Sequence, residues 1–272
     1  MKSRKKRGLL ITVLIIAIII IILLIALFLH FFVFSGNDTE NQSASSSEAS
    51  VTETYTTTEW TNEKGEFTYA EEPDMDAIDF DELNVINDEI YAWIYVPNTN
   101  VDYPVAQPYK SGDDFYYFEH NIYKEYQFSG TICSETHNTR TFDDPVTVLY
   151  GHNMINGTMF ASLHQFEDPD FFNDNNTIFV FTKDKLITYL IYSAFDYDDR
   201  HIMNSFHFNL KEDFKSFVND TINPRSIVYN VRPDVTINDD DDKLLVLSTC
   251  SNHSYTSRFL VVGVKVRERI KK

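Results

Sequence analysis

A long apolar run near the start of the chain constrains its organisation more than any other feature of the sequence. The run extends from Leu9 to Leu29 and continues after His30 to Phe34. As a helix, a run of this length crosses a bilayer core roughly 30 Å thick. A cleavable signal peptide is the alternative, but its apolar region would span roughly 7 to 15 residues and would end at a small-residue cleavage site. Because neither condition is met, residues 9–34 are predicted to form one transmembrane signal anchor.

Charges predict the orientation of this anchor and argue against one class of partner. Residues 1–8 carry five Lys and Arg side chains, and such basic segments stay in the cytoplasm. The chain after Phe34 is therefore predicted to lie outside the cell, attached to the cell membrane. The net charge of −18 argues against nucleic acid as a partner, because binding to phosphates requires an excess of cations.

Composition separates a stalk from a folded domain. Residues 35–75 are rich in Ser, Thr and Glu and poor in aliphatic side chains. Such a segment cannot bury enough apolar surface to offset its ordering entropy, so it is predicted to be a disordered stalk. Residues 76–272 are predicted to form one domain of ordinary size.

The domain is predicted to be mainly β. Short segments rich in β-branched and aromatic residues are separated by turn residues, which is typical of strands. The predicted strands cover residues 93–96, 101–105, 130–134, 146–151, 177–182, 186–195, 244–249 and 259–266. The pattern indicates a mostly antiparallel barrel with helices attached.

Three helices are predicted around these strands. The first precedes Trp93 and is loosely amphipathic. Its apolar positions are Ile78, Leu83, Val85, Ile86 and Ile90. A short helix is predicted over residues 159–166 and a longer one over residues 209–222. In the longer helix Asn209 precedes Glu212 by three residues, as in a capping box.

The chain contains two cysteines, Cys133 and Cys250, which is too few for a disulfide scaffold. Cys250 ends one predicted strand, and Arg258 immediately precedes the next. If these strands form a hairpin, the two residues face each other across its open end, roughly 5 Å apart. A guanidinium near a thiol favours the thiolate and can also donate to an oxyanion. Cys133 is predicted to be a core residue.

His152 is the third candidate for chemistry. It follows a buried-looking strand that ends at Gly151, so it is expected at the rim of the barrel. Histidine is the side chain best suited to proton transfer near neutral pH. The order of the residues allows Cys250, His152 and Arg258 to converge, but spacing alone does not prove it.

Three segments of the chain resemble the sortase family, specifically class B. They are YGHNM at residues 150–154, TIFVFT with the following LITYLIYSAF, and LSTC at residues 247–250 with the following SRFLVVGV. The resemblance covers roughly residues 93–266. It implies an eight-stranded barrel with an N-terminal helix, in which the helix at residues 209–222 is the additional helix of class B.

The resemblance also implies a reaction and its partners. In sortases a Cys thiolate attacks the carbonyl of a Thr in a C-terminal sorting signal, and an amine resolves the resulting thioester. Carried over, Cys250 is the nucleophile, His152 protonates the departing amine and Arg258 holds the carbonyl or the oxyanion. Ser248 and Thr249 would line the pocket. The implied partners are surface proteins with a sorting signal and a peptidoglycan precursor or cross-bridge amine, and no cofactor or metal is expected.

Some positions depart from the class B pattern. Asp114 and Phe118 stand where class B sequences resemble Asn and Leu in the substrate groove, and Cys133 stands where an apolar residue is usual. A further groove contact maps near Ile202. These departures leave the sorting signal open, and a pilin-polymerising sortase remains an alternative to one that anchors proteins to the cell wall.

Two interpretations outside the family also remain open. A secreted cysteine peptidase would use the same nucleophile but pass the acyl group to water. A tethered, non-enzymatic binding module would have no reactive thiol. The acidic run from Asn238 to Asp242 lacks the Gly turn and terminal Glu of a calcium loop and is predicted to be a solvated turn. The remaining histidines have no metal-ligand spacing and are predicted to be surface or turn residues: His120, His137, His164, His201, His207 and His253.

Overall fold

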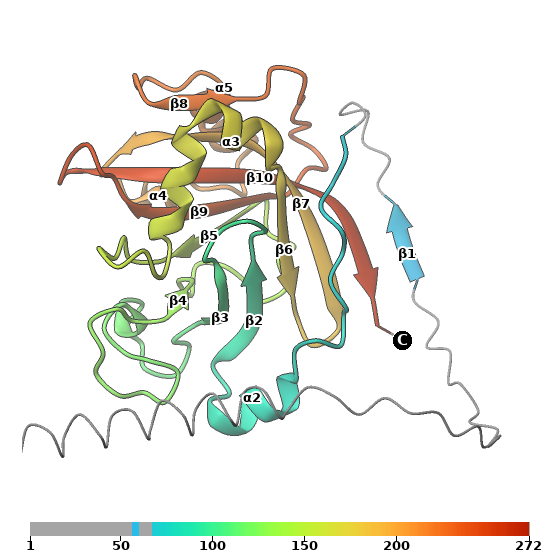
Figure 1. Cartoon of the computed structure of the whole chain (residues 1–272), viewed down its shortest axis with the longest axis vertical. Helices are drawn as coiled ribbons and strands as arrows, with labels where there is room; N and C mark the ends of the chain where they lie inside the picture. Colours follow the sequence, from blue (N-terminus) through green and yellow to red (C-terminus); the bar gives the residue numbers. More distant parts are fainter. Residues whose placement is uncertain (1–55, 60–66, 272) are drawn as a thin grey trace, which may run out of the picture. The chain divides into compact units, whose positions relative to one another are not determined.

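The computed structural model describes residues 56–59 and 67–271 and is mainly β (Figure 1). The predicted transmembrane span at residues 9–34 and most of the predicted stalk lie outside the described residues. In the part of the chain that is described, no helix is both long and apolar enough to cross a membrane.

Eight strands close into a barrel, as predicted. In spatial order they are β10 (Ser257–Ile270), β9 (Leu244–Cys250), β5 (Val146–Tyr150), β4 (Ile132–Cys133), β3 (Asp102–Ala106), β2 (Ile90–Tyr95), β6 (Thr177–Phe181) and β7 (Lys185–Asp198). Antiparallel pairing of β7 with β10 closes the ring. Two further strands add to it: β1 (Thr56–Glu59) pairs with β10, and β8 (Tyr229–Val231) pairs with β7.

Two pairings within the ring are parallel, and one of them assembles the site described below. β3 is parallel to β4, and β5 is parallel to β9. Parallel strands place their carboxyl ends at the same edge of a sheet. In β5 and β9 these ends are in register, with Tyr150 opposite Ser248 and the N–H of Gly151 donating to the carbonyl of Ser248 at 3.1 Å. His152, two residues beyond the end of β5, and Cys250, the last residue of β9, therefore lie at the same rim of the barrel.

β9 and the middle of β10, from Phe259 to Val264, are mostly apolar because both of their faces are covered. Leu247 and Val261 belong to the cluster inside the barrel. Their neighbours Val246 and Val262 belong to a second cluster on the outer face, which includes Phe217 of α5 (Lys211–Ile222). Successive side chains of a strand point to opposite faces, so the α5 side of the sheet is a second core rather than a solvated surface.

The predicted first helix forms as α2 (Phe80–Ile86), but it is shorter than expected. Asp79 caps it by accepting hydrogen bonds from the N–H groups of residues 81 and 82. Phe80 and Leu83 are partly buried and pack against core clusters, whereas Val85 is 87% exposed and Ile90 belongs to β2. The predicted apolar face is therefore confirmed for Leu83 and wrong for Val85, and Ile90 is a strand residue.

The predicted capping box of the long helix is also wrong. The helix begins at Lys211, after Leu210, which makes no side-chain cap. Instead, Asp213 reaches back and accepts a hydrogen bond from the backbone N–H of His207 at 2.6 Å. An acidic side chain in the first turn thus ties the incoming loop to the helix, and Asn209 is not needed for capping.

The other helices are short and lie in connections between strands. The element predicted at residues 159–166 is a 3₁₀ helix, η2 (Ala161–Glu167), which starts after Met159 because that residue has a left-handed φ of 57°. α3 (Pro169–Asp174), α4 (Ile202–Ser205) and a 3₁₀ helix, η1 (Tyr116–Phe118), were not predicted. The Asp168-Pro169 pair, an N-cap followed by Pro at the first helical position, is a signal that could have revealed α3.

Residues 67–75, which the sequence analysis assigns to the stalk, contact the barrel. Met75 is buried, and the carboxylate of Glu72 lies 2.9 Å from both Arg267 and Arg269 on β10. Burial raises the pKa of Glu72, but the two guanidinium groups outweigh burial and hold that pKa below its ordinary value.

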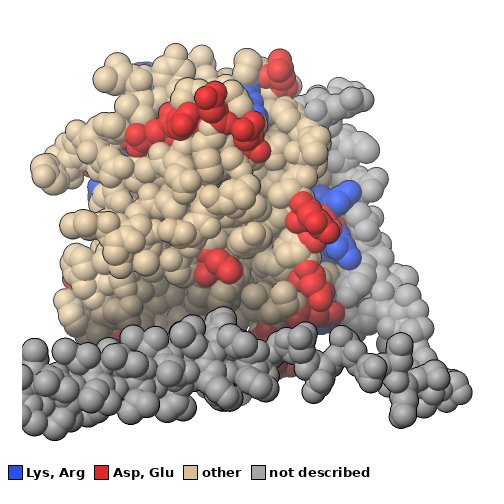
Figure 2. Space-filling model, in the orientation of Figure 1, with Lys and Arg blue, Asp and Glu red and all other residues tan. Residues whose placement is uncertain are grey.

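On the face shown in Figure 2, acidic side chains clearly outnumber basic ones.

Candidate active site

Cys250 and Arg258 are direct cross-strand neighbours, as predicted. They form the register pair at the open end of the β9–β10 hairpin. Opposed residues of an antiparallel pair project from the same face of the sheet, with Cα atoms roughly 5 Å apart. Arg258 is partly buried, whereas Cys250 is exposed. The Arg258 side chain and the accessible Cys250 thiol therefore project from the same face of the sheet.

The two cysteines differ in the property that decides reactivity. Neither forms a disulfide, and Cys133 is buried in the barrel wall, which confirms its predicted place in the core. Burial, with smaller contributions from Glu135 and Asp114, raises the pKa of the Cys133 thiol far above its ordinary value. Because the thiolate is the nucleophile, Cys133 is inert and Cys250 is the thiol available for chemistry.

His152 lies at the same rim as Cys250. On β5, β9 and β10, the residues Val148, Val246 and Leu260 belong to the outer cluster. Counting along the strands in steps of two places Cys250 and Arg258 on that same outer face. His152 lies two residues beyond the end of β5, and the ring of Phe118 contacts both His152 and Tyr150, which packs on the outer cluster.

The ring of His152 is held by an aromatic frame. Its Nε2 lies 2.9 Å from the carbonyl oxygen of Phe118, and since a carbonyl only accepts, Nε2 carries a hydrogen. The Phe118 ring meets the imidazole edge-on at 6.0 Å, and Phe128 stacks on it at 5.6 Å. The free position for proton transfer is therefore Nδ1. Among the hydrogen bonds of the described residues, none joins the His152 ring to Cys250. Hydrogen bonds between catalytic groups often form only when substrate is bound.

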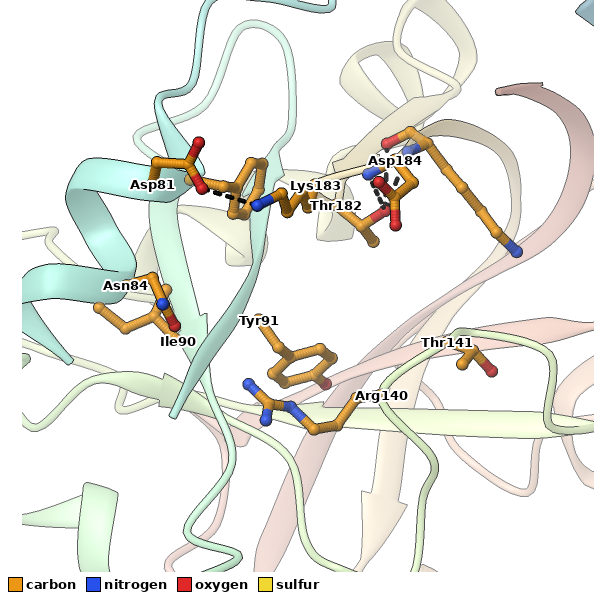
Figure 3. Close-up of a pocket in the computed structure, with 11 residues that line it drawn as sticks. Asp81, Asn84, Ile90, Tyr91, Arg140, Thr141, Thr182, Lys183 and Asp184 are labelled. Carbon is orange, nitrogen blue, oxygen red and sulfur yellow. Dashed lines mark hydrogen bonds and ion pairs between the residues drawn. The ribbon is translucent and has the colours of Figure 1, made fainter. Parts of the chain in front are cut away.

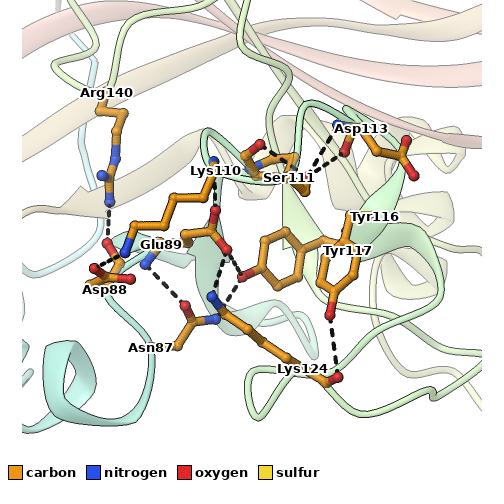
Figure 4. A network of polar contacts seen from close by, with 11 residues as sticks. Asn87, Asp88, Glu89, Lys110, Ser111, Asp113, Tyr116, Tyr117, Lys124 and Arg140 are labelled. Atoms are coloured by element: carbon orange, nitrogen blue, oxygen red, sulfur yellow. Dashed lines mark hydrogen bonds and ion pairs between the residues drawn. The ribbon is translucent and has the colours of Figure 1, made fainter.

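A buried polar network holds the segment that carries Phe118 (Figure 4). The carboxylate of Glu89, at the start of the barrel, accepts hydrogen bonds from the hydroxyl of Tyr117 at 2.8 Å and from the N–H of Lys110 at 3.0 Å. Lys124 lies 2.9 Å from the same carboxylate. Burial raises the pKa of Glu89, but these donors outweigh burial and lower that pKa below its ordinary value. Both ends of the loop around η1 are thus attached to one ionised side chain.

The predicted pocket residues beside the nucleophile separate into two faces. Ser248, two residues before Cys250, shares its face and is buried. Thr249 alternates to the opposite face, where its register partner Phe259 belongs to the cluster inside the barrel. The structure therefore places Ser248 on the face of the nucleophile and Thr249 toward the barrel interior.

The other predicted groove residues lie along a row of aromatic contacts. Phe118 is in contact with His152, and its ring lies 5.6 Å from that of Phe115. Phe115 in turn meets His201, which caps α4 immediately before Ile202. Ile202 itself is buried, and Asp114 accepts a hydrogen bond from the N–H of residue 136 at 2.8 Å. The row leads from the proposed acid to α4.

Asp114, Glu135 and His137 are the described residues that could hold a metal ion. One ligand atom from each lies within 4.8 Å of the others. Glu135 is buried and lies 2.7 Å from Nε2 of His201, so its charge already faces a cationic partner when that ring is protonated. The sequence spacing of the histidines gave no sign of this group, and nothing in the proposed chemistry requires a metal.

The sequence analysis missed a polar contact to the backbone carbonyl of Cys250. His164, predicted to be a surface residue, has a side chain that is only 8% exposed and stacks on Phe259 with ring centroids 4.7 Å apart. Its Nε2 lies 3.0 Å from the carbonyl oxygen of Cys250. The sequence carried no signal for this contact, because η2 and the strand end that meet here are distant in the chain.

A cavity of about 410 Å³ lies elsewhere, near α2 and the β6–β7 turn (Figure 3). Arg140 lies over the ring of Tyr91 at 5.1 Å, and Lys183 donates to Asp81 at 2.7 Å. None of the predicted site residues lines this cavity, so it is separate from the rim that carries Cys250.

A family model described as a sortase domain matches residues 94–266, which is more than half of the chain. The chain belongs to the sortase family. Among solved structures, sortase B of Clostridium perfringens is 32% identical with a TM-score of 0.61, and the match covers 69% of this chain and 100% of that one. A Streptococcus pyogenes class B sortase involved in pilus biogenesis is 28% identical with a TM-score of 0.57, covering 69% of this chain and 98% of that one.

A curated relative, sortase B of Listeria monocytogenes, is 39% identical over 90 residues. That match covers 33% of this chain and 35% of the relative, so this chain spans about a third of the Listeria protein's length. These relatives are class B sortases, which are cysteine transpeptidases, and the resemblance drawn from the sequence is confirmed.

Proposed function

We propose that this sortase is a membrane-anchored transpeptidase that cleaves a C-terminal sorting signal after Thr and transfers the surface protein to a peptidoglycan amine. The observation that carries this proposal is the register pair of Cys250 and Arg258, with His152 at the same rim. It supplies a nucleophile, a donor for the oxyanion and a proton carrier within one small area.

The first half of the reaction forms an acyl-enzyme. The Cys250 thiolate attacks the Thr carbonyl carbon and forms a C–S bond, while the carbonyl oxygen becomes an oxyanion beside the Arg258 guanidinium. The intermediate collapses, the peptide C–N bond breaks, and protonated His152 gives the proton on Nδ1 to the departing amine. The product is a thioester between the surface protein and Cys250.

The second half reverses these roles. The acceptor amine attacks the thioester carbon, and His152 takes the proton that the amine loses. The C–S bond then breaks and the Cys250 thiolate is restored. If water attacked instead, the enzyme would act as a peptidase. Transfer therefore requires that the rim admit an amine.

A panel of sorting-signal peptides tests the reaction. We expect purified protein to cleave either an Asn-Pro-x-Thr-type or a Pro-Pro-x-Thr-Gly-like peptide after Thr, and to form a covalent adduct at Cys250 detectable by mass spectrometry. Cys250→Ala should abolish both. A wild-type protein that cleaves neither peptide and leaves Cys250 unmodified by a thiosulfonate peptide mimic would instead favour a tethered binding module.

Polymerisation of pilins is the second candidate function. It is favoured by the similarity to the Streptococcus pyogenes class B sortase involved in pilus biogenesis. The two candidates differ in the acceptor, which is a cross-bridge amine for wall anchoring and a Lys side chain for polymerisation. Competition between a peptidoglycan cross-bridge peptide and a pilin-derived Lys peptide in the transfer assay decides between them.

The proposed location rests on the apolar run at residues 9–34 and the basic residues before it. We infer that this run anchors the protein with its catalytic domain outside the cell. Protease added to intact cells should digest the domain, and deletion of residues 9–34 should release the protein from the membrane fraction. Protection from external protease would contradict this orientation.

A further inference from the structure

A polar cluster contacts the backbone carbonyl of Cys250. The carbonyl oxygen of Cys250 receives two contacts, from Nε2 of His164 at 3.0 Å and from Nδ2 of Asn153 at 3.1 Å. The far nitrogen of His164, Nδ1, lies 2.5 Å from Oε1 of Glu167. Asn153, His164 and Glu167 are called the carbonyl clamp below.

The clamp joins the three segments that carry the proposed chemistry. Asn153 directly follows His152, and the ring of His164 stacks on Phe259, which directly follows Arg258. Both contacts converge on the one carbonyl group of Cys250. Fixing this carbonyl fixes the peptide plane after the nucleophile, which includes the Cα atom that carries the thiol side chain.

Glu167 extends the clamp to the loop after the nucleophile. While Oε1 holds His164, Oε2 lies 2.8 Å from Nε2 of His253. Asn153 also donates to Oδ1 of Asn252 at 2.8 Å. The hairpin loop that separates Cys250 from Arg258 is thus attached at two points to η2 and to the segment after β5.

We propose that His164 and Glu167 are positioning residues for the transpeptidation reaction, which align the Cys250 thiol with His152 and Arg258 without touching the substrate. The inference rests on the proposed function for its kinetic test. Its structural basis is independent, because the clamp's polar contacts go to backbone and loop atoms of the site. Displacing a reacting group by a fraction of an ångström is costly in rate, whereas substrate affinity is set elsewhere.

Two substitutions of His164 separate positioning from packing. His164→Phe keeps the ring that stacks on Phe259 and removes both polar contacts. His164→Gln loses the ring but places an amide N–H near the position of Nε2, so it can still donate to the Cys250 carbonyl. We expect His164→Phe to lower kcat about tenfold, the effect of losing one hydrogen bond, with little change in KM, and His164→Gln to retain most of the activity.

A measurement without substrate makes the result independent of the proposed function. The ¹³C shift of the Cys250 carbonyl reports its hydrogen bonds, and we expect it to move in His164→Phe and to stay near the wild-type value in His164→Gln. His207→Phe, at an exposed position outside the clamp, is the matched control and should change neither the shift nor kcat. Thermal unfolding of each variant shows that it is folded.

The two His164 variants and the carbonyl shift each have a result that contradicts the proposal. If His164→Phe is as active as wild type, or if His164→Gln is the more damaged variant, ring packing matters and the positioning role is overturned. An unchanged carbonyl shift in His164→Phe overturns the clamp itself. If the wild-type protein transfers no acyl group while the shift responds as expected, the proposed function fails and the clamp stands as a feature of the site.

Discussion

A methyl group added at Gly151 would have no space, and the strain would reach His152 one residue further along the chain. A Cβ atom at this position would lie 2.5 Å from Cδ1 of Ile132 and 2.8 Å from Cδ2 of Phe160, closer than real contacts allow. Both neighbours are fully buried and cannot move into solvent. Overpacking of this kind costs about 1–3 kcal/mol in the free energy of unfolding.

A double-mutant cycle tests this reasoning. Ile132→Val removes Cδ1, the atom nearest to the new methyl group, and by itself costs about 0.5–1.5 kcal/mol. We expect Gly151→Ala to lower the melting temperature by about 2–4 °C per kcal/mol. The two changes together should cost at least about 0.5 kcal/mol less than the sum of their separate effects in urea unfolding.

Catalysis offers a second measure of the same strain. The N–H of Gly151 donates to the carbonyl of Ser248, so a shifted backbone at residue 151 displaces His152 relative to Cys250. We expect kcat to fall in Gly151→Ala and to recover in part when Ile132→Val is added. Strictly additive unfolding energies, or a Gly151→Ala variant with unchanged stability, would refute the steric argument.

Three further predictions follow from the site. The hydrogen bond that His253 donates to the Glu167 carboxylate raises the pKa of His253 above its ordinary value of 6.5. The His253–Glu167 ion pair is therefore complete below pH 6.5 and is lost as the pH rises through the raised pKa. An NMR titration should show this pKa falling toward its ordinary value in Glu167→Gln, and no change would contradict the pairing. Iodoacetamide should modify the folded protein once, at Cys250, and the unfolded protein also at Cys133. Two adducts on the folded protein, detected by mass spectrometry, would show that Cys133 is accessible to the reagent. Arg258→Ala should lower kcat by about 10²–10³, as removal of an oxyanion donor does, and a loss confined to KM would argue that Arg258 only binds substrate.

The Cys250–Arg258 pair could be predicted from the sequence because it depends on a local hairpin. Two apolar strands separated by a short loop leave few possible registers, and the pair lies at the last position of the ladder. His152 is different, because the strand before it pairs in parallel with a strand far along the chain. Nothing in local spacing encodes that pairing, and it was the family resemblance that brought His152 to the site.

The errors share a physical cause. Val85 was assigned to a buried face, and Asn209 to a capping box, because local periodicity and spacing allowed it. In the folded protein Val85 is 87% exposed, and Asp213 ties the loop that enters α5. For His164 the local sequence led to the opposite error, because a buried residue was predicted to lie at the surface. A histidine in a short connection has no pattern of its own, and its buried role is created by a strand end from another part of the barrel.

The parallel pairing of β5 with β9 has a consequence for how the enzyme acquires its activity. The thiol and its cation meet within one hairpin, whereas Asn153 and Cys250, which lie 97 residues apart, meet only when a long stretch of chain has closed. Contacts between distant residues form late in folding. We expect a refolding chain to expose a reactive Cys250 before it gains acyl-transfer activity, which pulsed alkylation would detect; simultaneous appearance of both would contradict this order. A newly made chain would then pass through a stage in which Cys250 is reactive but His152 is not yet in place beside it.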